Sequence, residues 1–177
     1  MSDRMDESNK YFDEGMELYK EGKFKEAIVC FDKAIEINPK YEYAWNGKGN
    51  ALSDLNKYEE AIFCYDKALE INPNNEYAWN NKGFALYALK KYEEAIVCYN
   101  KAIAVNPKYE KAWNNKGAAL SGLNKYEEAI VCYDKAIEIN PNFEYAWYGK
   151  GNVLEKSGKY KEAIECYEQV LIINPNH

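Results

Sequence analysis

Five cysteines are the residues of this chain best suited to chemistry, because thiolates bind metals and act as nucleophiles. They stand 34 residues apart, at Cys30, Cys64, Cys98, Cys132 and Cys166. Zinc and redox sites place their ligands two to four residues apart, and disulfide scaffolds do not space single cysteines so widely. The spacing therefore indicates small thiols packed beside apolar residues, and it predicts no metal and no cofactor.

Acid–base and nucleophilic sites are also absent from the sequence pattern. The one histidine is His177, at the last position. Acids such as Glu59 and Glu60 are adjacent in sequence, so on a helix their side chains diverge instead of converging on one point. No nucleophile elbow, phosphate-binding loop or dinucleotide-binding glycine pattern is present. We therefore expect no catalytic residue and no enzymatic activity.

Residues that determine structure also recur every 34 residues, which is typical of a repeat protein. Glycine, alanine and proline recur at fixed places in all five intervals. Tryptophan recurs in four of them, as Trp45, Trp79, Trp113 and Trp147, and Tyr11 completes the series in the first. Five intervals cover 8–41, 42–75, 76–109, 110–143 and 144–177, and residues 1–7 remain as an N-terminal tail. We expect a single repeat array with no second domain.

Each interval has the pattern of two helices joined by a turn. In residues 42–75, Trp45 and Leu52 share one face at helical spacing and predict a helix over residues 43–55. A second apolar stripe predicts a helix over residues 58–71, which ends there because the residue before a proline is disfavoured in helical conformation.

The turn between the two helices requires a residue that tolerates a left-handed backbone. Asn56 stands there in the second interval, and Gly22 and Gly158 stand there in the first and last. Glycine and asparagine accept this conformation at a helix end. Lys90 departs from the pattern in the third interval, at a small energetic cost.

Together these residues resemble the tetratricopeptide repeat family. The pattern W-x-x-K-G-x-x-L, followed by A-x-x-x-Y, alanine and proline, matches the family over all five intervals. The resemblance implies an all-α fold: a right-handed superhelical solenoid of five helix-turn-helix repeats, with about ten helices. It also implies that the first helices line a concave groove that binds peptides or partner helices.

A lysine stands in the tryptophan motif where the family usually has leucine. Its methylene stem can cover the core while the ammonium group stays in water, so we interpret these lysines as structural. They are Lys48, Lys82, Lys116 and Lys150.

Positions that differ between the five intervals are the candidates for ligand contact. Beside the tryptophan stripe of the first helix, the residues vary between tyrosine, asparagine and apolar types, and the resemblance places these positions in the groove. Asparagine can hydrogen-bond a peptide backbone, and tyrosine supplies flat contact area. The alternative is that they are ordinary solvent-facing residues. The predicted groove residues are Tyr43, Asn46, Asn50, Tyr77, Asn80, Asn81, Phe84, Lys111, Asn114, Asn115, Tyr145, Tyr148 and Asn152.

Some members of the family capture a C-terminal carboxylate with a clamp of two lysines, two asparagines and one arginine. Asn50, Asn81 and Lys111 match that clamp, but Asn46 replaces the first lysine and Asn115 replaces the arginine. Without the arginine there is no bidentate grip on a carboxylate, so we do not expect this chain to be a receptor for carboxylate tails.

An amide ladder is the closer resemblance, because asparagine recurs at one level of the first helix in Asn46, Asn80 and Asn114. Other members hold peptide backbone with such ladders, independently of the peptide's sequence. Within the repeated WNNKG motif we expect Asn80 to contact a ligand directly, with Asn81 as the second candidate.

The C-terminal interval is more apolar than the others, since Val170 and Ile172 replace alanine and, in most intervals, glutamate. A terminal repeat has no neighbour to cover it, and exposed apolar surface marks an interface. We expect either that the chain is a fragment of a longer protein or that two copies form a homodimer through this end. The alternative function is thus a structural or assembly module that self-associates through its uncapped C-terminal repeat.

The charge balance of the chain limits its partners. The 177 residues carry a net charge of -6, and the basic residues are interleaved with glutamate, which argues against a nucleic-acid partner. The first residues lack the apolar core of a signal peptide, and no apolar run reaches the roughly 18 residues that span a membrane. We expect a cytoplasmic protein–protein interaction scaffold that binds a peptide or helical segment of a partner, and no membrane partner.

Overall fold

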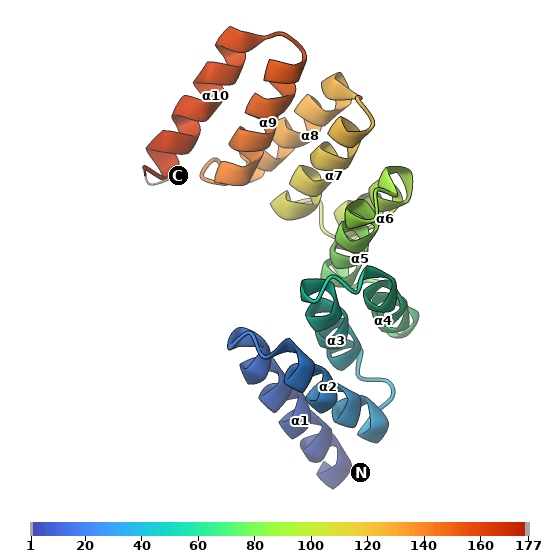
Figure 1. The fold of residues 1–177 in the computed structure, drawn as a ribbon. Helices are drawn as coiled ribbons and strands as arrows, with labels where there is room; N and C mark the ends of the chain where they lie inside the picture. Colours follow the sequence, from blue (N-terminus) through green and yellow to red (C-terminus); the bar gives the residue numbers. More distant parts are fainter. Residues whose placement is uncertain (1, 176–177) are drawn as a thin grey trace. The chain divides into compact units, whose positions relative to one another are not determined.

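The computed structural model describes residues 2–175, and this part of the chain is built from α-helices. The chain forms two compact units, unit 1 over residues 1–89 and unit 2 over residues 90–177. The helices of unit 1, blue to green in Figure 1, are α1 (Ser2–Lys20), α2 (Phe24–Ile37), α3 (Glu42–Asp54), α4 (Tyr58–Ile71) and α5 (Glu76–Ala88). Those of unit 2, green to red, are α6 (Tyr92–Val105), α7 (Glu110–Gly122), α8 (Tyr126–Ile139), α9 (Glu144–Lys156) and α10 (Tyr160–Ile173).

The helix boundaries confirm the predicted pattern of the second interval to within one residue at α3 and α4. The N-terminus differs from the prediction, because α1 begins at Ser2 and residues 2–7, expected as a tail, extend the first helix. Ser8 is buried, and its hydroxyl donates to the Ala34 carbonyl oxygen at 3.0 Å, which ties α1 to α2. The single array over residues 8–177 stays a prediction, and His177 lies outside the described residues.

The turns adopt the left-handed backbone that the sequence predicts. Gly22 and Gly158 have φ of 75° and 79°, and Asn56 has φ of 59°. Lys90 also adopts this conformation, with φ of 61°, although the left-handed region is energetically unfavourable for a lysine backbone. The turn geometry is therefore imposed by the repeat, and glycine or asparagine only makes it easier to form.

Within each unit, consecutive helices pack side by side as antiparallel neighbours would. In unit 1, α1 contacts α2 and α3 contacts α4, while α1, α3 and α5 form a second row of contacts. In unit 2, α7 contacts α8, α9 contacts α10, and α7 also contacts α9. The first helices of successive repeats thus lie next to one another, which is the condition for a shared surface.

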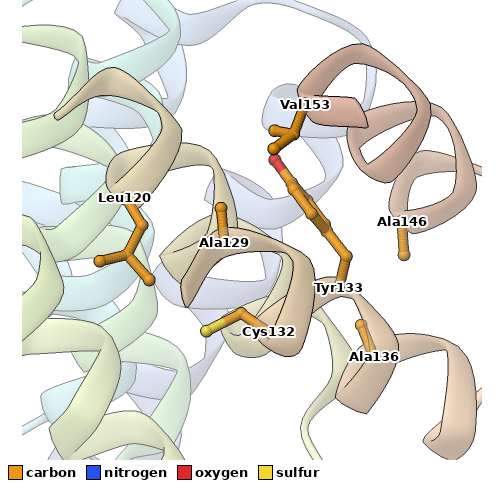
Figure 2. Packing of buried hydrophobic residues seen from close by; sticks show 7 residues of the cluster. All are labelled: Leu120, Ala129, Cys132, Tyr133, Ala136, Ala146 and Val153. Carbon is orange, nitrogen blue, oxygen red and sulfur yellow. The ribbon is translucent and has the colours of Figure 1, made fainter. Parts of the chain in front are cut away.

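An aromatic ring of the second helix fills the space between first helices. A Cβ atom added to Gly49 would lie 2.6 Å from the Tyr65 ring, so the glycine allows α3 and α4 to approach closely. The equivalent ring in unit 2 is Tyr133, which extends from α8 toward Val153 of α9 in Figure 2. Each of the two rings belongs to a buried apolar cluster of its unit.

The tryptophans connect the first helix to the preceding loop. The indole nitrogen of Trp45 donates to the Pro39 carbonyl oxygen at 3.1 Å, and Trp113 makes the same bond to Pro107 at 3.0 Å. Trp79 and Trp147 repeat it with Pro73 and Pro141. Each tryptophan thus ties its helix to the loop that carries the proline.

The lysines of the tryptophan motif have a second structural role that the sequence reading missed. Their ammonium groups lie over the tryptophan rings, and three of them pair with an aspartate of the preceding repeat. Lys48 pairs with Asp32 at 2.6 Å, and Lys150 pairs with Asp134 at 2.7 Å. Lys82 and Asp66 form the third pair, at 2.5 Å. The ion pairs join successive repeats within each unit.

Lys116 lacks this aspartate because Asn100 stands at the equivalent position of α6. We expect Asn100→Asp to supply the missing ion pair and to stabilise unit 2 by about 0.5 kcal/mol, the size of a partly exposed pair. Thermal unfolding followed by circular dichroism should show a midpoint about 1–2 °C higher. Asp134→Asn should lower it by a similar amount, and 1 M NaCl should remove both effects. A lower midpoint for Asn100→Asp would contradict the pairing.

Candidate functional site

An open hollow of about 200 Å³ lies in unit 1, where the first helices adjoin. It combines amides, hydroxyls, one carboxylate and one exposed aromatic ring. The lining residues are Tyr19 of α1, Asn50, Ser53 and Asp54 of α3, Tyr65 of α4, and Asn81 and Phe84 of α5. We refer to this set as the hollow.

The amides of the hollow form a hydrogen-bonded chain. Asn50 Oδ1 accepts from the Tyr65 hydroxyl at 2.9 Å and from Asn81 Nδ2 at 2.9 Å. Asn81 Oδ1 accepts from Asn80 Nδ2 at 3.3 Å. Because the Asn50 oxygen already accepts two bonds, its amide group is fixed in orientation, and its Nδ2 donates to no other described residue. Two N–H donors of Asn50 are left for a ligand.

The carboxylate of the hollow is held by a tyrosine. The Tyr19 hydroxyl donates to Asp54 Oδ2 at 2.5 Å. Burial, together with this hydrogen bond and the Asp54 charge, raises the pKa of Tyr19 to about 12, so the phenol stays protonated at neutral pH. Asp54 makes no ion pair among the described residues, and its Oδ1 accepts no bond there. The hollow therefore presents an uncompensated negative charge.

The predicted groove residues of unit 1 separate into two groups. Asn50, Asn81 and Phe84 line the hollow, and the Phe84 ring is 47% exposed. Tyr43 and Tyr77 are exposed but lie outside it. Asn80 is only 6% exposed, so its neighbour Asn81 presents the more accessible amide.

The asparagines of the predicted amide ladder, Asn46, Asn80 and Asn114, have buried side-chain atoms or low exposure. Asn46 Oδ1 and Asn114 Oδ1 are buried and accept no hydrogen bond in the described part of the chain. A ligand N–H cannot reach these oxygens unless the side chains rotate. Contact of a ligand with Asn46, Asn80 and Asn114 stays a prediction, but the structure favours the positions next to them.

Unit 2 holds the remaining predicted groove residues. Lys111, Tyr145 and Tyr148 are exposed on α7 and α9, and Asn114 Nδ2 donates to Asn115 Oδ1 at 3.2 Å. Asn152 Oδ1 lies 2.8 Å from the Tyr167 hydroxyl, as Asn50 does with Tyr65 in unit 1. The amide–tyrosine pair is thus a feature of both units.

The structure corrects one expectation about the C-terminal end. Val170 was expected to contribute to an exposed apolar surface, but it is 2% exposed, because it occupies the alanine position of α10 that faces the core. Ile172 is 70% exposed, and Leu171 beside it is also exposed. Self-association through this end stays a prediction. The buried side chain of Val170 would not contact a second copy directly.

The cysteines are free and buried, as the spacing indicates. Burial raises the pKa of Cys64 to about 11 and also raises the pKa of Cys132, so these thiols are poor nucleophiles. Among residues 2–175, no cluster of three histidine, cysteine or acidic side chains is arranged to hold a metal ion. In the same range no helix is long and apolar enough to cross a membrane.

Comparison with known protein families identifies the repeat. The tetratricopeptide repeat model matches residues 42–75, 76–109, 110–143 and 144–177, and a second model of the same repeat matches residues 15–55. The chain belongs to the tetratricopeptide repeat family. Tetratricopeptide repeats form protein-interaction scaffolds and are typically not enzymes.

Solved tetratricopeptide repeat proteins share the fold over nearly the whole chain. MamA from Desulfovibrio magneticus is 23% identical with a TM-score of 0.84, and 97% of each chain is covered. PilF of Pseudomonas aeruginosa is 24% identical with a TM-score of 0.87, covering 97% of this chain and 78% of that one. YrrB is 23% identical with a TM-score of 0.73, covering 94% and 86%. At these identities the likeness concerns the fold alone.

One sequence relative matches only a part of this chain. An uncharacterised protein of Methanocaldococcus jannaschii is 37% identical over 52 residues, which are 29% of this chain. The match spans 60% of the length of that relative.

Four residues of the hollow are absent from the list of predicted groove residues: Tyr19, Ser53, Asp54 and Tyr65. The comparison between repeats could have found Asp54, because lysine, alanine or glycine stands at its place in the other intervals. Tyr65 gave no such signal, because a tyrosine or phenylalanine stands at its position in every interval. Such a pattern indicates a core residue.

Proposed function

We propose that this protein is an interaction scaffold that binds an extended peptide segment of a partner protein and catalyses no reaction itself. The peptide backbone is held in the hollow of unit 1. The observation that carries this proposal is the Asn50 amide, whose oxygen is held by Tyr65 and Asn81 while its N–H groups are left for a ligand. A fixed amide donor suits a backbone carbonyl oxygen, because little entropy is lost when the bond forms.

The surroundings of Asn50 support a peptide more than a small molecule. The hollow is open, so a chain can run through it toward the exposed rings of Tyr43 and Tyr77. Amides bind the backbone whatever the sequence, and exposed aromatic rings provide contact area for side chains. Among the similar structures, YrrB is a tetratricopeptide repeat protein with an unusual peptide-binding site. The fold is therefore compatible with peptide capture.

Selection from a random peptide library tests this function. The full chain is immobilised and exposed to displayed peptides, and a recovered peptide is synthesised with a fluorescent label. We expect Asn50→Ala combined with Asn81→Ala to weaken its binding about 10-fold or more, because two amide contacts are removed. The dissociation constants are measured by fluorescence anisotropy.

A matched pair of substitutions controls for the loss of asparagine itself. Asn74 and Asn142 are exposed loop residues that do not line the hollow, so Asn74→Ala with Asn142→Ala should leave the affinity unchanged. Circular dichroism of each variant establishes that the helices are intact. Recovery of no peptide above the level of the bare support, or equal weakening by both pairs, would refute the proposal.

A further inference from the structure

The carboxylate of Asp54 is the part of the hollow that backbone binding does not use. No lysine or arginine is among the residues that line the hollow, and Asp54 makes no ion pair within the described chain. Asp54 is exposed, and its unpaired carboxylate repels anions and attracts cations. Its charge must be balanced either by solvent ions or by a ligand.

Aromatic and hydroxyl groups around Asp54 suit a cationic side chain. The Tyr19 hydroxyl occupies Oδ2 and fixes the carboxylate, and this leaves Oδ1 for a second donor. The exposed residue Phe84, on α5, also lines the hollow, and aromatic faces attract cations. The hollow therefore offers a guanidinium or ammonium group both a carboxylate and an aromatic ring.

The backbone donor and the carboxylate lie on one helix, separated by one helical turn. Asn50 and Asp54 are four residues apart on α3, so their side chains point to the same face. A residue whose carbonyl oxygen accepts from Asn50 has its side chain within reach of Asp54. The two contacts thus define one binding position along a peptide.

Unit 2 contains a comparable group of residues. The Tyr167 hydroxyl lies 2.9 Å from Glu155 Oε2 and 2.8 Å from Asn152 Oδ1, and the Tyr148 ring centroid is 6.0 Å from that of Tyr167. A carboxylate, an asparagine and an aromatic ring therefore gather on the first helix of the last repeat as well. Each unit would then have a surface that can bind a cationic side chain.

We propose that the hollow selects a basic residue, arginine or lysine, of the bound peptide, whose side chain pairs with Asp54 while its backbone is held by Asn50. This inference rests on the proposed function and adds to it the chemistry of the partner, a basic segment. It is the opposite preference to a carboxylate clamp, whose arginine and first lysine are replaced in this chain.

The composition of the selected peptides is the first test. Peptides recovered by the wild-type chain should carry arginine or lysine at one fixed position, and selection on the Asp54→Asn variant should lose that enrichment. Peptides without any basic preference would overturn this inference and leave the proposed function standing. Failure to recover any peptide would overturn both.

The second test compares arginine with citrulline, its uncharged isostere, in a recovered peptide. The wild type should bind the arginine form about 10-fold more tightly, and Asp54→Asn should reduce the difference to about 2-fold or less. Glu59→Gln removes the same charge from an exposed position of α4 outside the hollow and should retain the preference. Raising the salt from 0.05 to 0.5 M should weaken only the arginine form. An equal arginine preference in wild type and Asp54→Asn would refute the role of Asp54.

Discussion

Tyr65→Ala is expected to lower the free energy of unfolding of unit 1 by about 3–5 kcal/mol, the range for removal of a buried aromatic ring. Tyr65 is 1% exposed, and its ring fills the space beside Gly49 between α3 and α4. An alanine leaves a cavity that rigid helices cannot close. The hydrogen bond that orients Asn50 is lost at the same time. Guanidinium chloride unfolding, followed by circular dichroism, measures the change.

Tyr65→Phe separates the ring from the hydroxyl. The ring still fills the core, so the loss should be about 1 kcal/mol, the net value of one hydrogen bond. The first repeat already has phenylalanine at this position, Phe31, and that ring is fully buried. Equal destabilisation by Tyr65→Ala and Tyr65→Phe would show that the hydroxyl, and not the packing, holds α3 and α4 together.

Val170→Asp is expected to cost more than about 3 kcal/mol, because it places an unpaired carboxylate in an apolar core. Val170 is 2% exposed, on the face of α10 that packs against the rest of unit 2. The sequence grouped this residue with Ile172 as exposed surface, so the substitution tests the placement directly. Thermal unfolding should show a much lower midpoint or a loss of helical signal.

Ile172→Asp is the matched control, since Ile172 is 70% exposed on the same helix. Its stability should change by less than about 0.5 kcal/mol. If the exposed side of α10 mediates self-association, the wild type should sediment as a larger species at high concentration and Ile172→Asp should not. Similar destabilisation by both substitutions would contradict the described orientation of α10.

Local features of the fold were predictable from the sequence because they follow from short-range physics. Apolar spacing located α3 and α4, and the proline after α4 marked its end. Gly22, Asn56 and Gly158 occupy the left-handed turns that their residue types indicated. Each of these features depends on neighbours within a few residues, and five copies of the pattern make the signal stronger.

The candidate site was predictable only in part. Sequence reasoning led to Asn50 and Phe84 through the variation between repeats, and to Asn81 through the partial match to a carboxylate clamp; all three line the hollow. It also ranked Asn80 above Asn81, and only the structure shows that Asn80 is nearly buried. Adjacent positions on a helix differ by about 100° in direction, so a small rotation of the packed helix decides which amide faces solvent. Sequence spacing does not determine that rotation.

The sequence alone determined the repeat, its family and the helices, because these are encoded in a 34-residue pattern of local preferences. Only the tertiary structure decided which side chains meet: Lys48 with Asp32 and Tyr19 with Asp54 between repeats, and Tyr65 with Asn50 between the two helices of one repeat. It also placed Val170 in the core. These contacts join residues that are 15 to 35 positions apart, and they depend on how whole helices pack.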